Sequence, residues 1–348
     1  MAEEPAAAVA TEGTGFEDIA RLEHAVGVGP WKLAARRLRR NKVALAFAVL
    51  FILLVATAVA APIWAHDVAH TDVGTNHLTE VLKEGNKSVY VVALNGIPAG
   101  PQWFNAGGKF FLGADANGRD IMVRLLYGAR TSLEIGVSAA LITTIFAVII
   151  ALLAGYLGGI VDTVISRIMD VVWAFPVVIL GVALGTALSI GGLKIGPITI
   201  QSGSLLIPIL IIGFVYVPYI ARPLRGQVFS LREKEFIEAA RAQGMGPIRI
   251  MFSEILPNLA STIVVFFPLS IANAILLEAY LSFLGAGVQP PTPSWGEMIS
   301  EGINLITTAP HLTIVPGVML VLTVLSLNIF GDGVRDALDP RAKVRIEL

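Results

Sequence analysis

Cysteine is absent from the 348 residues of this chain, and charged residues make up only 15% of it. Without cysteine the chain forms no disulfide bond and offers no thiolate as a nucleophile or metal ligand. A soluble domain keeps about a quarter of its residues charged to cover its surface. This chain is 55% hydrophobic with a mean hydropathy of +0.74. The scarcity of charge therefore excludes an ordinary soluble domain.

Features of an enzyme or a nucleic-acid-binding protein are also missing. The net charge of −1 and the lack of interleaved basic and aromatic residues argue against a nucleic-acid partner. The chain has no G-x-x-x-x-G-K-[ST] loop, so we expect it not to bind ATP itself. Because no catalytic set of residues is present either, we expect a protein that is not an enzyme.

What the chain has in abundance is long apolar runs. A helix crosses the bilayer core, about 30 Å thick, in roughly 20 residues. Windows of that kind cover residues 43–61, 133–157, 171–190, 205–221, 259–277 and 312–330. Several contain proline, which membrane helices tolerate only where neighbouring groups satisfy the freed carbonyl. The sequence predicts an all-α membrane protein with about six packed transmembrane helices.

Lysine and arginine gather at residues 32–42, 222–249 and 335–345, whereas the loop between the third and fourth windows carries only Lys194. Because basic residues favour the cytoplasmic side, both termini and the loop 222–257 are predicted to be cytoplasmic. The long segment 66–132 also contains six Lys and Arg residues, yet this topology places it on the outer side of the membrane. Loops of such length obey the rule poorly.

The chain divides into five predicted regions. Residues 1–30 form a disordered cytoplasmic tail, since they lack an apolar face. Residues 31–65 form a basic juxtamembrane segment and the first transmembrane helix; the basic part either lies on the anionic leaflet or is a plain positive-inside anchor. An extracytoplasmic segment, 66–132, precedes a transmembrane core, 133–332, which includes the cytoplasmic loop 222–257, and a cytoplasmic tail, 333–348.

The cytoplasmic loop has its own helix signals. Ser230 followed by Glu233 forms a capping box, which predicts that a helix begins there. Gly244 stands where a left-handed C-cap is needed, and Pro247 suits the first turn of a second short helix. Pro257 disfavours helix at the preceding residue and predicts a bend before the fifth window. The loop therefore projects as a helix–glycine–helix element.

This loop resembles the EAA signature of the membrane subunits of bacterial ABC importers. The signature falls on Glu238, Ala239, Ala240, Gly244, Leu256 and Pro257. The resemblance implies that these residues form the coupling helix, which docks into a partner ATPase subunit. One departure is Glu254, where the family has an apolar residue. The alternative is an amphipathic surface helix in an unrelated membrane protein.

Four further stretches, 112–136, 167–176, 282–295 and 331–341, are similar to the dipeptide/oligopeptide permease C family. Ala114 replaces the usual Thr and Val123 the usual Ser. The resemblance covers about residues 36–65 and 112–341. It implies a type I ABC importer (MetI-like) permease fold in the bacterial cytoplasmic (inner) membrane.

The same resemblance implies partners. They are a second, B-type permease, two ATPase subunits that hold ATP and Mg, and an extracytoplasmic peptide-binding protein. It implies no cofactor on this chain. Peptides are the implied cargo, with nickel or another chelate left open because some relatives carry it.

Charged residues in or near the spans are candidates for function because charge is expensive in the membrane. Glu278 is a candidate pathway or gate residue, and pairing with Arg130 is the alternative. Arg167 and Asp170, three residues apart, are expected to form a structural ion pair.

Two polar groups lie within the segment 66–132, one at its start and one toward its end. His66 and His70 would clamp a metal if that stretch were helical, although a metal site is the less favoured interpretation. Asp115, Arg119 and Asp120 are expected to cap and orient a helix at the outer surface, with substrate contact as the alternative.

Two other functions compete with an ABC permease. An ion-driven secondary carrier usually places ionisable residues at mid-membrane depth, whereas the charges here gather near the ends of spans. A membrane anchor would not need prolines in its spans. Both features favour the permease.

Overall fold

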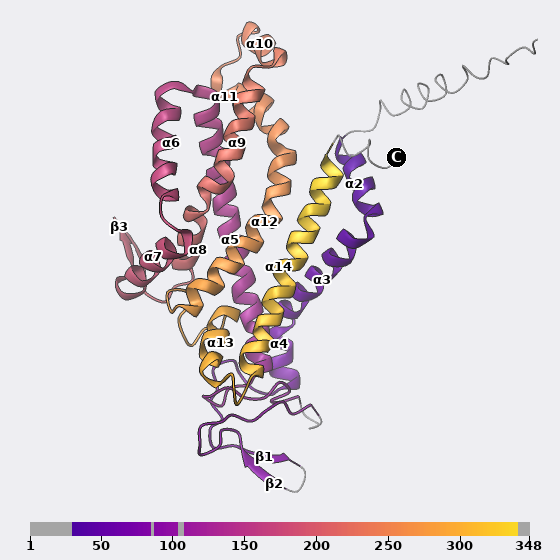
Figure 1. The fold of residues 1–348 in the computed structure, drawn as a ribbon, viewed down its shortest axis with the longest axis vertical. Helices are drawn as coiled ribbons and strands as arrows, with labels where there is room; N and C mark the ends of the chain where they lie inside the picture. The colour runs from indigo at the N-terminus through magenta and orange to yellow at the C-terminus, as the bar shows by residue number, and fades with distance from the viewer. Residues whose placement is uncertain (1–29, 85–86, 104–107, 340–348) are drawn as a thin grey trace, which may run out of the picture.

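The computed structural model describes residues 30–84, 87–103 and 108–339. The predicted tail 1–30 and residues 340–348 lie almost wholly outside the described part. Long helices dominate the fold and run side by side along its longest axis (Figure 1). The prediction of an all-α membrane protein is confirmed.

Five helical runs are long and apolar enough to cross a membrane, and the number rises to six if one bent pair counts as a span. The five are α3 (Lys42–Val59); α5 (Ile121–Leu152) with the π-helix η2 (Leu153–Leu157); α8 (Leu206–Val215) with α9 (Val217–Arg232); α11 (Pro247–Arg249) with η3 (Ile250–Ile255) and α12 (Leu256–Phe283); and α14 (His311–Leu338). They match five of the predicted windows.

The remaining window, 171–190, the third along the chain, is not one straight helix. The chain instead forms α6 (Gly159–Trp173) and α7 (Val177–Gly191), bent by 83°. Pro176 is the reason, because proline disfavours the helical conformation of the residue before it. It stands at the N-cap of α7 with extended backbone, φ −55° and ψ 126°.

Two helices extend further than their apolar windows. α5 begins at Ile121, inside the predicted extracytoplasmic segment, and α14 continues to Leu338, past the predicted core boundary at 332. The Asp120 side chain caps α5 by accepting a hydrogen bond from the Val123 N–H at 3.0 Å. The expectation that this acidic group caps a helix is confirmed.

The molecule has two distinct ends (Figure 1). At the loop end lie α10 (Glu235–Ala242), α2 (Pro30–Arg40) and the last turns of α14. Arg37 Nη1 of α2 donates to the Asp339 carbonyl at 2.8 Å. At the opposite, hairpin end lie α13 (Trp295–Gly302) and the antiparallel pair of β1 (Val81–Glu84) and β2 (Lys87–Tyr90).

Shorter elements join these parts. α4 (Ala61–Ile63) and the π-helix η1 (Trp64–Val68) follow α3, and η4 (Ile303–Leu305) follows α13. β3 (Leu193–Ile195) and β4 (Ile198–Ile200) form a second antiparallel pair between α7 and α8. Many large apolar side chains stay exposed, including Ile52 at 63% on α3. Such surface suits lipid or another membrane subunit.

Candidate functional site

The cytoplasmic loop begins later than its capping box predicts. α9 continues through Ser230 to Arg232, and α10 starts at Glu235 after an extended Lys234. Because Ser230 lies inside α9, the backbone N–H groups around it are already bonded within a helix and need no cap. The prediction of a helix start at Ser230 is therefore wrong.

The glycine that ends α10 is where the sequence predicts it. Gly244 has φ +80°, and its N–H donates to the Arg241 carbonyl at 2.9 Å. The Met245 N–H donates to the Ala240 carbonyl at 3.1 Å. These two bonds form a Schellman motif, which requires a left-handed residue at this position. α11 then begins at Pro247, also as predicted.

The segment before the fifth span stays helical at Leu256 and Pro257, although proline was predicted to disfavour helix at the residue before it. The helical path from Pro247 to Phe283 is continuous, with a π-helical segment, η3, directly before α12. A π-helix shifts the hydrogen-bond ladder by one residue, and such shifts absorb a missing N–H without ending the helix. Leu256 packs against the core of the loop end, whereas Pro257 is exposed.

α10 has one buried face and one open face. Ile237 and Ala240 are buried in the core that also holds residues of α5 and α9. Glu238, Ala239 and Gly244 are exposed. A small residue at 239 leaves the α10 backbone approachable from outside. The loop thus combines rigid attachment to the spans with an accessible outer face.

Apolar and charged side chains around α10 enlarge this face, and of these the sequence analysis singled out only Glu238 and, as part of a capping box, Glu233. Phe236, Ile248 and Phe252 are 40%, 70% and 58% exposed. Beside them, a hollow of about 410 Å³ is lined by Arg232, Glu233, Glu238 and Arg241. Exposed apolar groups rimmed by charge are typical of a protein-binding surface. The apolar and charged residues are visible in the sequence of the loop, but their exposure can be seen only in the folded structure.

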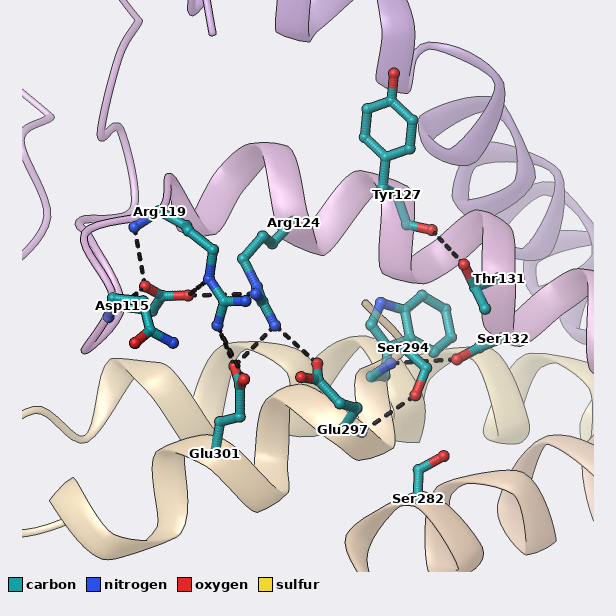
Figure 2. A network of polar contacts seen from close by, with 12 residues as sticks. Asp115, Arg119, Arg124, Tyr127, Thr131, Ser132, Ser282, Ser294, Glu297 and Glu301 are labelled. Atoms are coloured by element: carbon teal, nitrogen blue, oxygen red, sulfur yellow. Dashed lines mark hydrogen bonds and ion pairs between the residues drawn. The ribbon is translucent and has the colours of Figure 1, made fainter. Parts of the chain in front are cut away.

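The hairpin end holds a network of charged side chains between the start of α5 and α13 (Figure 2). Arg119 Nε lies 2.6 Å from Asp115 Oδ2, and Arg119 Nη2 lies 2.7 Å from Glu301 Oε2. Arg124 Nη2 lies 2.7 Å from Glu297 Oε2 and 2.8 Å from Glu301 Oε2. These ion pairs fasten α13 to α5 and to the loop before it.

The two glutamates of this network differ in proton affinity. Burial raises the pKa of the Glu297 carboxyl to about 8, against the attraction of Arg124. Burial acts on Glu301 too, but the charge of Arg124 and the bonds to Glu297 and Arg119 outweigh it and lower the pKa of Glu301. One proton therefore belongs on Glu297, where it relieves the repulsion between neighbouring carboxylates.

A cavity of about 220 Å³ adjoins the network. Its polar lining comes from Asp115, Asn117, Arg124 and Glu301, and apolar side chains such as Leu312 complete it. Sequence analysis named Asp115, Arg119 and Asp120 but missed Arg124, Glu297 and Glu301. The spacing of Glu297 and Glu301, one helical turn apart, was the available signal.

Glu278 lies in α12, fully buried, near this network. Ser132 Oγ donates to Glu278 Oε2 at 3.0 Å, and Ser282 Oγ donates to Glu278 Oε1 at 2.7 Å. The Ser132 hydroxyl also accepts from the Trp295 N–H at 3.2 Å. Glu278 thus joins α12 to α5 and, through Ser132, to α13. The alternative pairing with Arg130 is wrong, since Arg130 points to the surface.

Ion pairs also lie within α6 and between α6 and α9. Arg167 Nη1 lies 3.5 Å from Asp170 Oδ2, with both side chains largely exposed. Asp170 Oδ1 is closer to Arg222 Nη2, at 2.9 Å. Asp162 pairs with Arg225, whose Nη2 donates at 2.6 Å. α6 is therefore tied to α9 by two ion pairs that sequence spacing alone did not indicate.

His66 and His70 do not take the geometry of a metal clamp. His66 lies in the π-helix η1, and His70 follows it with φ +49°. His70 Nδ1 lies 2.8 Å from the His66 carbonyl oxygen. Within residues 30–84, 87–103 and 108–339, no group of three or more His, Cys, Asp or Glu side chains is placed to hold a metal.

Two parts of the chain match models of known protein families. Residues 147–344 match the family described as binding-protein-dependent transport system inner membrane component. Residues 29–80 match the N-terminal TM domain of oligopeptide transport permease C. Among solved structures, an inward-facing conformation of the MetNI methionine ABC transporter is similar, with a TM-score of 0.50 and 20% identity over 63% of this chain and 98% of that one.

Curated relatives are similar over nearly the whole length. The dipeptide transport system permease protein DppC of Alkalihalophilus pseudofirmus is 37% identical, with 91% of each chain covered. The glutathione transport system permease protein GsiD of Pectobacterium atrosepticum is 36% identical, with 90% of this chain and 92% of that one covered. Together with the matching family model, these relatives show that the chain belongs to the binding-protein-dependent transport inner membrane components, the multi-pass permease subunits of ABC importers.

Proposed function

We propose that this chain forms half of the translocation pathway of an ATP-driven importer of short peptides. Its loop around α10 is proposed to receive movement from partner ATPase subunits. The observation that carries this proposal is the construction of the loop. α10 is anchored in the core through Ile237 and Ala240 but presents Ala239 and the apolar side chain of Phe236 outward.

Short peptides are the cargo that the relatives favour. Relatives named for dipeptide and for glutathione transport are 37% and 36% identical to this chain. A di/tripeptide permease of Pseudomonas aeruginosa is 38% identical over 70% of this chain. Nickel or another chelate is the competing cargo, and competition between peptides and metal chelates in an uptake assay separates the two.

The proposed assembly contains a second, B-type permease, two ATPase subunits that bind ATP and Mg, and an extracytoplasmic peptide-binding protein. In this assembly the loop end faces the cytoplasm, where the ATPases reside. The absence of a phosphate-binding loop from the sequence supports the assignment of ATP binding to partners.

The first test is to purify the tagged chain gently from native membranes and identify its companions by mass spectrometry. Recovery of a homologous permease and ATPase subunits in similar amounts supports the proposal. Recovery of this chain alone, monodisperse in several mild detergents, would instead support a self-sufficient ion-driven carrier.

A substitution at the end of α10 tests the loop directly. Gly244→Arg places a bulky side chain on the exposed face, and we expect it to abolish ATP-driven uptake while the chain stays in the membrane. The matched control is Gly203→Arg. Gly203 has φ +81° against +80° for Gly244, and a Cβ at either position meets nothing within 4 Å. Equal loss of uptake in both variants would contradict the coupling role of the loop.

A further inference from the structure

The run of α5 and η2 ends at the loop end with carbonyls that need partners. The last turn of any helix leaves carbonyl oxygens without intrahelical donors, and it carries a partial negative charge. Here Gly158 ends the run with φ +68°. Arg232 Nη1 lies 3.3 Å from the Gly155 carbonyl and 3.4 Å from the Tyr156 carbonyl. The guanidinium of Arg232 therefore caps this helix end.

Gly158 makes room for that cap. A Cβ built on Gly158 would lie 2.8 Å from Arg232 Nη1. Gly159, the next residue, also has a positive φ of +55°, but a Cβ there meets nothing within 4 Å. The two neighbouring glycines thus share a positive φ and differ in whether Arg232 lies against them.

A second arginine reaches the same turn from α10. The Arg241 guanidinium lies 5.5 Å from the centre of the Tyr156 ring, a distance at which a cation is attracted to an aromatic face. Arg232 is the last residue of α9 and Arg241 lies in α10. One turn of η2 is therefore contacted from both sides of the break that separates α9 from α10.

The span that receives these contacts is long and closely packed. Helix from Ile121 to Leu157 is continuous over 37 residues. Near its end, a Cβ on Gly155 would lie 2.6 Å from Val228 Cβ of α9. At its other end, Arg124 binds Glu297 and Glu301 of α13. A displacement of the turn at Tyr156 is therefore carried along the continuous α5–η2 helix to the hairpin end.

We propose that Arg232 is a positioning residue that transmits movement of α10 to the end of the α5–η2 run at the loop end. The contact of the Arg241 guanidinium with the Tyr156 ring is the second link. This inference rests on the proposed function, because it assumes that ATPase subunits move α10. A charge-assisted hydrogen bond contributes enough free energy to change a two-state equilibrium by about tenfold. Losing the cap therefore weakens the coupling between ATP hydrolysis and peptide uptake, while the ATPase subunits and the translocation pathway both remain in place.

The test compares variants in the complete complex reconstituted in liposomes, measuring ATP hydrolysed per peptide imported. For Arg232→Gln we expect ATP hydrolysis to continue and the ratio of ATP to peptide to rise by about tenfold. Arg232→Lys keeps the charge and one donor to the carbonyls, so it restores part of the coupling. Arg167→Gln is the control, because Arg167 is an arginine of α6 whose side chain is 80% exposed and which makes no contact with η2 among those observed in the described residues.

A second pair of variants leaves Arg232 in place. Gly158→Ala displaces the guanidinium and strains the backbone, whereas Gly159→Ala strains the backbone alone. We expect only Gly158→Ala to raise the ratio of ATP to peptide. An unchanged ratio in Arg232→Gln and Gly158→Ala, even with less assembled complex, would show a purely local cap and overturn the inference. A wild-type complex without ATP-driven uptake would instead reject the proposed function.

Discussion

Glu278 shows how a carboxyl is kept inside the packed spans. Its two oxygens accept hydrogen bonds from Ser132 and Ser282, on α5 and α12. The Ser282 hydroxyl in turn accepts from the Val288 N–H at 2.9 Å. Buried polar groups persist only when hydrogen-bonded, and here the hydroxyls do this without an opposite charge. Glu278 is therefore a junction between three segments of chain.

Removing this junction leaves several polar groups without partners. We expect Glu278→Ala to destabilise the protein by about 1–3 kcal/mol for each hydroxyl left unsatisfied. Glu278→Gln retains an acceptor and a donor, so its loss is smaller. Thermal unfolding of the purified protein in detergent measures both. If Glu278→Ala melts no lower than Glu278→Gln, the serine contacts do not hold these segments together.

The sequence was sufficient to single out Glu278 but not to identify its partners. A carboxyl in an apolar run is costly, which draws attention to it from the sequence alone. Arg130 was the predicted alternative partner, yet Ser132 is the residue that contacts Glu278. Residues two apart in a helix point in different directions. Choosing between them required the rotation of α5 about its axis, which the sequence does not reveal because the polar residues in this part of α5 do not gather on one face.

At the scale of elements, α13 is held against α5 by ionisable groups. Its glutamates Glu297 and Glu301 both contact Arg124, with Arg119 and Asp115 completing the network. Ser294 caps α13 by accepting from the Glu297 N–H at 3.1 Å. Because its glutamates are buried or half-buried and paired with arginines, the attachment of α13 to α5 depends on the protonation of those glutamates.

Stability is expected to fall as the pH rises toward about 8. The pKa of Glu297 is about 8 in the folded protein, against an ordinary value of 4.5. Between those values the folded state binds a proton that the unfolded state has released, so the stabilising contribution is complete below about pH 4.5 and is lost by about pH 8. The lowered pKa of Glu301 has the opposite effect on stability: its stabilising contribution is present above the ordinary pKa and is lost as the pH falls below that value.

The measurement is the melting temperature of the purified protein from about pH 5 to about pH 9, compared with Glu297→Gln. The variant lacks the titrating group, so the difference between the two curves isolates it from Asp120, whose pKa burial also raises. Parallel curves for the two proteins would show that Glu297 does not titrate in this window.

Local signals predicted some elements well and others poorly. Gly244 and Pro247 act through backbone geometry that depends on a few neighbours, and both were predicted correctly. The capping box at Ser230 failed because a cap works only where a helix has free N–H groups. α9 arrives already helical, so the same four residues had nothing to cap. Element ends depend on what precedes them as well as on the local motif.

At the scale of the whole molecule, the lengths of the apolar windows predicted the transmembrane helices but not their bends or the helices against which they pack. Pro176 breaks the third window, 171–190, between α6 and α7 with an angle of 83°, and an average hydropathy over a window does not contain that angle. The ion pairs of Asp162 and Asp170 with α9 likewise depend on how the helices are packed. The order and lengths of spans are local properties, whereas their arrangement is set by contacts distant in sequence.

Sidedness is the whole-molecule property on which the proposed function depends. The Leu206–Arg232 run is 27 residues long and apolar enough to span a membrane. If it does, a residue a few positions before it and a residue at the end of α10 lie on opposite sides of the membrane. Gln201 and Gln243 are such positions, and both are exposed glutamines. The absence of cysteine from the chain makes single-cysteine labelling free of background.

We expect Gln201→Cys to react with a membrane-impermeant maleimide in intact cells, and Gln243→Cys to react only after the membrane is opened. The basic residues of the loop favour this orientation because they stay on the cytoplasmic side. Labelling of both cysteines from one side would show that Leu206–Arg232 does not cross the membrane. The reverse pattern would place α10 outside, where no cytoplasmic ATPase reaches it, and the proposed coupling role would fail with it.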